Sequence, residues 1–225
     1  HEAERILVVK LIDAIPRLRS VENIKFSNLF QNDELKDIIV AKGNTGKLLE
    51  KIIGLPAGNT LQDFDDGELK TNKARADGSP LETMFISQIS KRVDELLNNI
   101  DFKDSWIYSK ISRLIYVPVV KESSNPNDWY FLPHCYVEIN IGSEIYNQLN
   151  KDFENICQKM QDDIENGDGY LHTSSGVFIQ IRTKDAMPYN PIYSNKYGRI
   201  ISDKNFAFYF KKEFMTHIQI CSNGL

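Results

Sequence analysis

The segment from Asp63 to Lys70, Asp-Phe-Asp-Asp-Gly-Glu-Leu-Lys, brings carboxylates and an ammonium group close together. If the chain is a strand from Glu68 onward, Glu68 and Lys70 point to one face, because side chains alternate along a strand. Asp65 and Asp66, followed by glycine, predict a tight turn and are expected to be turn residues. Asp63 lies across that turn and can converge on the face of Glu68.

Two neighbouring carboxylates repel each other, and a hard divalent cation such as Mg²⁺ relieves that repulsion. Such a cation activates water and steadies the charge on a phosphate. Lys70 can orient the attacking water or stabilise the developing negative charge. The segment therefore suits phosphodiester hydrolysis. The same residues are also typical of a solvated charged hairpin, so the elements around them decide between the two interpretations.

Apolar spacing predicts those elements. Helices are expected over 2–20, ending near Pro16, and over 33–41. A strongly apolar helix between Leu48 and Ile53 is ended by Gly54. Strands are expected at 82–89, 112–120, 129–140, 176–183, 199–202 and 206–211, followed by a short helix. This order predicts an α+β fold with a mixed sheet flanked by helices.

The longest predicted helix, over 143–165, is amphipathic. Its apolar residues from Ile145 to Ile164 recur at helical spacing, and its solvent face is acidic. We expect it to divide two lobes around a cleft and to face away from any bound DNA. The strand at 112–120 is apolar enough to be central as far as Pro118.

Composition narrows the class of protein. The chain has 225 residues, 41% hydrophobic and 26% charged, which is ordinary for a globular protein. Its net charge of −4 means that any DNA binding must come from a local basic face. No apolar run approaches the roughly 20 residues of a membrane helix, and no signal peptide is evident. Because the sequence opens with His1, we expect a fragment or a processed chain.

The cysteines and histidines do not indicate a further catalytic or metal-binding site. Three widely spaced cysteines are typical of reduced thiols in a cytoplasmic protein. The four histidines are scattered, so neither a zinc site nor a Cys–His nucleophile pair is predicted.

A series of short motifs in one order resembles the MutH family, which contains a mismatch-repair nicking endonuclease and related restriction endonucleases acting at GATC. The resemblance covers roughly residues 42–215, and its specificity comes from the order of the motifs. They are Lys42-Gly43-x-x-Gly46-x-Leu48-Leu49-Glu50, Asp63-Phe64, Gly67-x-Leu69-Lys70-Thr71, Gly78-x-Pro80-Leu81-Glu82-Thr83, Lys110-x-x-Arg113, Val117-Pro118-Val119, Phe178-Ile179-Gln180-Ile181-Arg182-x-Lys184 and Phe208-Tyr209-Phe210-Lys211-Lys212.

The resemblance implies a restriction-endonuclease-like fold with two lobes around a DNA cleft, formed by a single domain over 1–225. It implies that Asp63 and Glu68 bind Mg²⁺ and that Lys70 is the catalytic lysine. Glu50 would be a supporting acidic residue near the metal, and Lys110 an accessory lysine contacting phosphate. The alternative for Glu50 and Lys110 is an ordinary surface position.

The same resemblance implies that Arg182, Lys184, Tyr209, Lys211 and Lys212 bind double-stranded DNA. Arg182 and Lys184 alternate along one strand, and arginine reads guanine bidentately. Tyr209 would lie near the adenine, where it could sense methylation. The alternatives are a solvated strand edge for Arg182 and Lys184 and a core aromatic for Tyr209.

One departure leaves the activity open. Only four residues separate Asp63 from Glu68, fewer than in the relatives. Three interpretations follow: an active Mg²⁺-dependent endonuclease at GATC, a DNA-binding allosteric domain without cleavage, and an interaction module. Within the family, the sequence most resembles a MutH-like, C-terminal domain of the GATC-cutting type II restriction endonuclease of the Sau type, whose partner would be a second MutH-like domain of the same chain.

Overall fold

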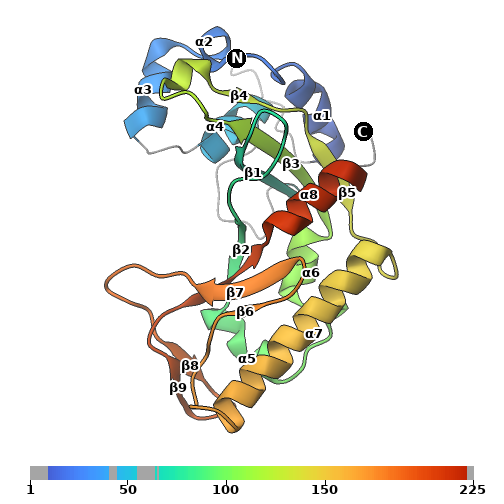
Figure 1. Cartoon of the computed structure of the whole chain (residues 1–225), viewed down its shortest axis with the longest axis vertical. Helices are drawn as coiled ribbons and strands as arrows, with labels where there is room; N and C mark the ends of the chain where they lie inside the picture. Colours follow the sequence, from blue (N-terminus) through green and yellow to red (C-terminus); the bar gives the residue numbers. More distant parts are fainter. Residues whose placement is uncertain (1–9, 41–44, 55–63, 65, 222–225) are drawn as a thin grey trace, which may run out of the picture. The chain divides into compact units, whose positions relative to one another are not determined.

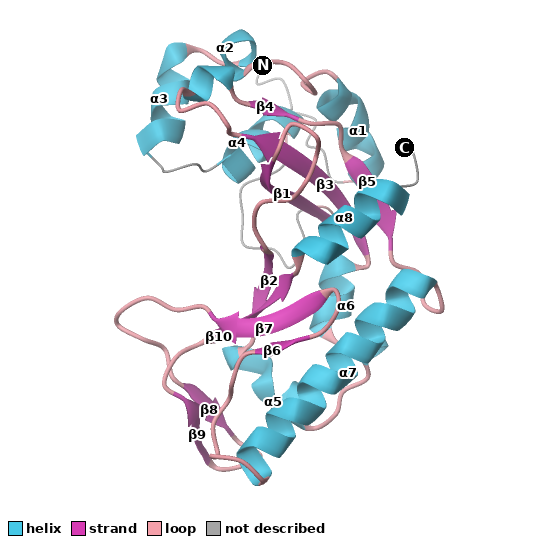
Figure 2. Ribbon diagram, in the orientation of Figure 1, coloured by secondary structure: helices cyan, strands magenta, loops and turns pink. Residues whose placement is uncertain are grey.

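The fold is seen in a computed structural model, which describes residues 10–40, 45–54, 64 and 66–221. The chain divides into two compact units. The first comprises residues 1–82, 112–138 and 216–225, and the second comprises 83–111 and 139–215. Figures 1 and 2 show the helices and strands of both. The helix over 143–165 was expected to divide two lobes, but it lies within the second unit. Two lobes around a DNA cleft stay a prediction.

The first unit is built on a four-stranded mixed sheet. β1 (Glu68–Ala74) runs parallel to β3 (Arg113–Val120), with Lys70 opposite Tyr116. β4 (Tyr130–Phe131) and β5 (Cys135–Glu138) both pair antiparallel with the other side of β3. β1 is therefore an edge strand and β3 is central.

Helices cover one face of this sheet. They are α1 (Leu11–Arg19), α2 (Phe26–Leu29), α3 (Asn32–Val40) and α4 (Thr45–Ile53), and the short 3₁₀ helix η3 (Pro126–Asp128) contacts α2 and α3. Their buried residues form one core with Leu69, Ile115 and Val117. Because side chains alternate, Glu68, Lys70 and Tyr116 lie on the opposite face. The sheet thus separates the hydrophobic core from the candidate chemistry.

The second unit is built on an antiparallel sheet of order β2-β10-β7-β6. Its strands are β2 (Met84–Gln88), β10 (Phe206–Phe210), β7 (Ile179–Thr183) and β6 (Ser174–Ser175). A separate hairpin joins β8 (Ile192–Ser194) to β9 (Arg199–Ser202). The remaining helices are η1 (Ser90–Arg92), α5 (Val93–Leu97), η2 (Phe102–Asp104), α6 (Trp106–Ile111), α7 (Glu144–Glu165) and α8 (Lys212–Cys221).

The long helix α7 packs against one face of this second sheet. It begins where the Ser143 side chain accepts a hydrogen bond from the backbone N–H of Tyr146. Phe153 of α7 stacks on Phe208 of β10, with ring centroids 5.8 Å apart. Neighbouring Tyr209 therefore points to the other face. α7 therefore packs against the face opposite Tyr209, and its expected orientation away from bound DNA stays a prediction.

Two prolines behave differently from expectation. Pro16 was expected to end the first helix, but α1 continues to Arg19 because Leu11, Ala14, Ile15 and Leu18 together bury one face of it. β3 covers nearly the range expected for it, but it stays central beyond Pro118, because Val119 and Val120 pair with both β1 and β4. Pro118 falls between the residues of β3 that pair with β5 and those that pair with β4, a break in the ladder that tolerates a missing N–H.

The strand expected at 129–140 is interrupted. It forms two short strands, β4 and β5, which are separated by residues 132–134. The backbone N–H of Leu132 still donates to the carbonyl of Pro118 (2.9 Å). Within the described ranges, no helix has the length and apolar character required to cross a membrane.

Candidate functional site

Glu68 and Lys70 form an ion pair at the start of β1. The Lys70 Nζ lies 3.4 Å from the Glu68 Oε1, and only 15% and 6% of the two side chains are exposed. Partial exclusion of water strengthens the attraction between the charges compared with a surface pair. The structure therefore brings these two predicted residues together. Asp63, the third member of the predicted set, lies outside the described residues.

The turn before Glu68 is fixed by contacts with other elements. The backbone N–H of Phe64 donates to the carbonyl of Gly67 (2.9 Å), which closes the turn. The Asp66 carboxylate accepts from the backbone N–H of Leu11, the first residue of α1 (2.8 Å), and lies 3.9 Å from Arg113. This N–H has no partner inside the helix, so Asp66 satisfies it. Asp66 therefore anchors the turn as well as forming part of it.

The donor set at this site fits a hard metal ion only in part. Glu68 supplies a buried carboxylate, the ligand type that Mg²⁺ prefers. Glu50 is half-buried on α4, a helix that packs against β1. Among the residues that the structure describes, no group of three or more His, Cys, Asp or Glu side chains is placed to hold a metal. The roles of Asp63 and Glu50 beside a metal stay predictions.

Tyr116 supports the pair from the central strand, and the sequence analysis did not identify it. It lies opposite Lys70 in the register, and its side chain is fully buried. Its hydroxyl makes no hydrogen bond with any described residue. Burial, together with the nearby Cys135 and Glu82, raises the pKa of Tyr116 well above its usual range. The ring therefore fills space beside Lys70 while its hydroxyl stays neutral.

Replacing Tyr116 with Phe is expected to raise the free energy of unfolding by about 1 kcal/mol, because a buried hydroxyl without a partner costs about that much. Urea denaturation followed by circular dichroism measures this change. Tyr108→Phe is the matched control, since the Tyr108 hydroxyl donates to the carbonyl of Ile139 (2.7 Å) and its removal should destabilise the protein. A similar loss in both variants would show that Tyr116 is hydrogen-bonded after all.

Lys110 lies on α6 in the second unit, where its side chain is half-buried. Glu50, Glu68 and Lys70 belong to the first unit. The accessory phosphate contact predicted for Lys110 therefore stays a prediction.

The predicted DNA-reading residues meet on the second sheet, on the face opposite α7. The guanidinium carbon of Arg182 lies 3.9 Å from the centre of the Tyr209 ring. Phe85 of β2 contacts Tyr209 edge to face, with centroids 5.8 Å apart. Tyr209 is only 6% exposed because these two side chains cover it, whereas Phe85 is 38% exposed. Tyr209 is thus neither in the core beneath α7 nor open to solvent.

Phe85 also lies on this face, and the sequence analysis did not identify it. A register shift between Phe208 and Tyr209 places Phe85 opposite Tyr209. Such irregularities re-aim side chains in a sheet. In the sequence, Phe85 stands between the apolar residues Met84 and Ile86, so alternation gives no sign that it points outward.

The three predicted lysines have different surroundings. Lys184 follows β7 and Lys212 begins α8, and both side chains are exposed. Lys211 is half-buried, and its ammonium group donates to the carbonyl of Gly176 (2.9 Å). Lys184 and Lys212 are therefore available for phosphate contacts, whereas Lys211 makes a contact within the protein.

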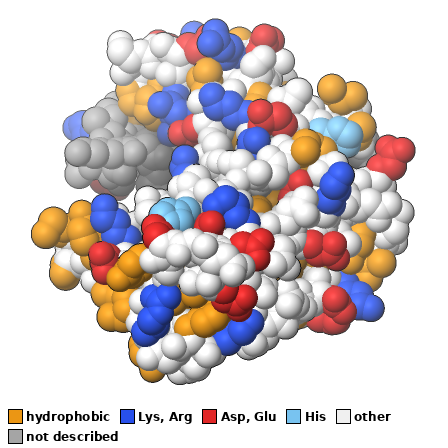
Figure 3. All heavy atoms as spheres, turned by 60° about the horizontal axis from the view of Figure 1, so that its bottom comes forward, with side chains coloured by type: hydrophobic (Ala, Val, Ile, Leu, Met, Phe, Trp, Pro, Cys, Tyr) orange, Lys and Arg blue, Asp and Glu red, His pale blue; other side chains and the backbone are white. Residues whose placement is uncertain are grey.

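Charged side chains of both signs are mixed on the surface. Figure 3 shows acidic and basic groups interspersed over the face that it presents. This distribution agrees with the net charge of −4. Any DNA contact on this face depends on a few well-placed cations rather than on a broad basic surface.

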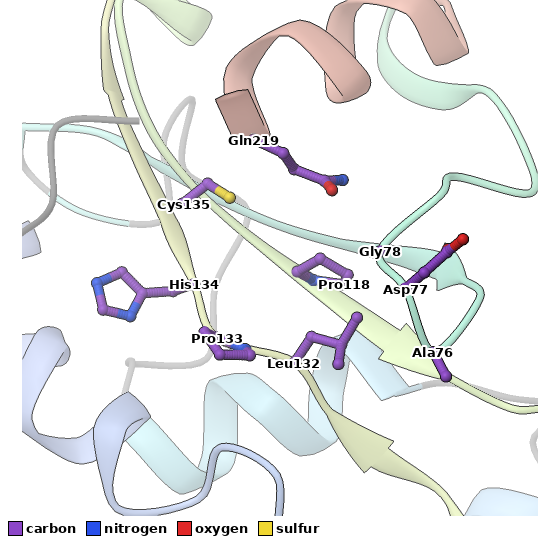
Figure 4. Close-up of a pocket in the computed structure, with 9 residues that line it drawn as sticks. All are labelled: Ala76, Asp77, Gly78, Pro118, Leu132, Pro133, His134, Cys135 and Gln219. Atoms are coloured by element: carbon purple, nitrogen blue, oxygen red, sulfur yellow. The ribbon is translucent and has the colours of Figure 1, made fainter. Parts of the chain in front are cut away.

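A pocket of about 360 Å³ in the first unit includes His134 and Cys135, which would be a candidate nucleophile pair. Figure 4 shows the His134 ring and the Cys135 sulfur on opposite sides of the chain. The His134 Nδ1 lies 2.6 Å from a carboxylate oxygen of Glu22. Burial raises the pKa of the Cys135 thiol to about 11, so it is not a thiolate at neutral pH. This pocket does not have the chemistry of a thiol hydrolase.

Comparison with known proteins gives the family. The profile of the family described as DNA mismatch repair enzyme MutH matches residues 54–152. The DNA mismatch repair protein MutH of Histophilus somni (strain 2336) is 26% identical over 233 residues, which cover 97% of this chain and 93% of that protein. The protein of the same name from Haemophilus influenzae (strain 86-028NP) is 30% identical over 224 residues, which cover 91% of this chain and 92% of that protein. Similarity of this extent, spanning both compact units, establishes that the chain belongs to the MutH family of DNA endonucleases.

Proposed function

We propose that this protein recognises GATC in double-stranded DNA and hydrolyses a phosphodiester bond there with Mg²⁺ as its cofactor. The observation that carries the proposal is the Glu68–Lys70 pair, held 3.4 Å apart on one face of an edge strand. A carboxylate and an ammonium group so placed can serve a metal ion and a phosphate together.

Asp63 and Glu68 would hold the ion, with Glu50 supporting them. When bound, Mg²⁺ supplies a more acidic water and neutralises charge on the phosphate. The Lys70 ammonium is kept in place by Glu68 and donates its N–H groups to the attacking water or to a phosphate oxygen. Lys110 is proposed as the second phosphate contact. The low exposure of Glu68 and Lys70 limits competition from bulk water.

Arg182 is proposed to read guanine, of which GATC has one per strand. A guanidinium group binds the O6 and N7 of guanine bidentately, and this requires a fixed orientation of its plane. The contact between the guanidinium group and the Tyr209 ring supports such a restriction. Tyr209 and the exposed ring of Phe85 would lie near the neighbouring adenine, while Lys184 and Lys212 would contact phosphates.

The direct test uses two supercoiled plasmids, one with a single GATC and one without. We expect the first to be cut in the presence of Mg²⁺, to stay intact with EDTA, and to be cut again when Mg²⁺ is restored. The second plasmid should stay intact throughout. Cleavage of both plasmids alike would contradict GATC recognition, and cleavage in EDTA would contradict the metal requirement.

A second candidate function is GATC binding without cleavage, as in the allosteric domain of a Sau-type restriction enzyme. It is favoured by the short spacing between Asp63 and Glu68 and by the closed turn between Phe64 and Gly67. An intact GATC plasmid, together with tight and specific binding of a GATC duplex, would support this candidate. If cleavage occurs, its product separates two roles: a nicking endonuclease gives open circles, whereas a restriction endonuclease gives linear DNA.

A further inference from the structure

Asp152 is a buried carboxylate on α7 that the proposed chemistry does not use. It is 2% exposed, and its oxygens accept hydrogen bonds from three consecutive backbone N–H groups: Val177 (2.9 Å), Phe178 (2.6 Å) and Ile179 (3.2 Å). The side-chain amide of Gln148 donates a fourth bond (2.8 Å). Four donors match the capacity of a carboxylate, so the buried charge is fully satisfied. Asp152 therefore ties the beginning of β7 to α7.

Gly176 and Lys211 hold the same turn from other directions. A Cβ on Gly176 would lie 2.3 Å from the Asp152 Cγ, a separation that real Cβ atoms essentially never show, so only glycine allows this approach. Lys211 donates its backbone N–H to the carbonyl of Phe178 (2.8 Å) and its ammonium group to the carbonyl of Gly176 (2.9 Å). We call Asp152, Gly176 and Lys211 the clasp.

We propose that the clasp is a positioning device that fixes the register of β7 against β10, so that Arg182 lies over Tyr209. The proposal rests on the proposed function, in which Arg182 reads the DNA. Asp152 and Lys211 are positioning residues, because they act through Arg182 and need not touch the DNA themselves.

The apolar pattern of β7 cannot set this register by itself. Ile179 and Ile181 are buried, and Gln180 and Arg182 face the other side. A slip of one residue would exchange the two faces, but a slip of two residues would preserve the alternation. Such a slip would still carry Arg182 about 7 Å along the strand, away from Tyr209. A fixed point near the start of β7 excludes it, and Asp152 binds β7 at its first residue, Ile179.

The test compares binding of a GATC duplex with binding of a duplex in which the site is scrambled. Asp152→Asn exchanges one acceptor oxygen for a donor amide and should lower the preference for GATC about tenfold, the size of one lost base contact. Binding to the scrambled duplex should not change. Because the change is buried, Gly176→Ala is a second variant, which forces the turn away from Asp152 and should have the same effect.

The matched control is Asp94→Asn. Asp94 has similar bonds in the same unit, from the Ser194 hydroxyl (2.7 Å) and the backbone N–H groups of Asn195 (2.8 Å) and Lys196 (3.2 Å), but it anchors β8. The Asp94→Asn variant should have a lower melting temperature and an unchanged preference for GATC. If Asp152→Asn and Gly176→Ala also change only the melting temperature, the role of the clasp is merely structural and the proposal is overturned.

A double variant tests the proposal through the preference for GATC, in a way that a loss of stability alone cannot imitate. If the clasp acts through Arg182, adding Arg182→Ala to Asp152→Asn should produce no further loss of preference for GATC. Additive losses would overturn the proposal, because independent sites add. A wild-type protein with no preference for GATC would refute the proposed function instead, so the two failures are distinguishable.

Discussion

Replacing Lys70 with Ala is expected to lower the rate of plasmid cleavage about 10²–10³-fold, the usual effect of removing one donor to developing negative charge. The structural basis is the position of its ammonium group, 3.4 Å from the Glu68 carboxylate and largely shielded from water. Binding of a GATC duplex without divalent ions should change little, because Lys70 acts on the reacting phosphate. Cleavage of a single-site plasmid over time gives the rate, and gel retardation gives the affinity.

Two further variants separate chemistry from folding. Lys73→Ala removes an exposed lysine from the same strand and should leave the rate unchanged. The double variant Glu68→Gln and Lys70→Met removes both charges of the buried pair at similar volume, so it should be inactive and at least as stable as the wild type. An active Lys70→Ala protein would refute the role of Lys70 in the reaction.

Replacing Arg182 with Ala is expected to reduce the preference for GATC by about 1–3 kcal/mol, the value of a bidentate contact to guanine. The reason is that the guanidinium carbon of Arg182 lies 3.9 Å from the centre of the Tyr209 ring, a contact that restricts the positions its donors can take. Titration of a GATC duplex and a scrambled duplex at one salt concentration measures the preference. An equal loss for both duplexes would indicate a phosphate contact instead.

Arg92→Ala is the matched control for that experiment. Arg92 also lies in the second unit and also contacts an aromatic ring, with its guanidinium carbon 5.2 Å from the centre of Trp106. It is paired with Glu95 in a short ion pair at the surface. Because Arg92 contacts Trp106 and has no assigned role in reading DNA, its removal should leave the preference for GATC unaltered.

Much of the fold was predictable where an element buries one side over a long stretch. The helix expected over 143–165 is α7, because its apolar spacing and the Ser143 cap both lie in the local sequence. β9 was expected at the residues where it occurs. By contrast, α5 and β8 are too short for a periodic pattern. Their conformation depends on distant contacts, such as the bond from the Ser194 hydroxyl to Asp94, one hundred residues away in the chain.

The site shows the same limit. Alternation predicts that Glu68 and Lys70 share a face, but the burial of the pair comes from packing across β3, which no local pattern contains. The resemblance implies that Lys211 binds DNA, and no local pattern shows that its ammonium group donates to the carbonyl of Gly176; its DNA contact stays a prediction. Asp152 could have been recognised from the sequence, because it falls in the apolar stripe of α7, between Leu149 and Ile156. An acidic side chain buried at such a position needs hydrogen-bond donors around it, because an unpaired buried charge is costly.

The division of the chain into two compact units has a consequence for evolution. The Glu68–Lys70 pair lies in one unit and the Arg182–Tyr209 stack in the other. Each unit has apolar packing of its own, around Ile115 in the first and around Phe208 in the second. Under the proposed function, substitutions that change the preferred DNA sequence can therefore accumulate separately from substitutions that abolish or restore hydrolysis. A protein with this fold could then lose hydrolysis and keep its DNA recognition, or keep hydrolysis while its preferred DNA sequence changes.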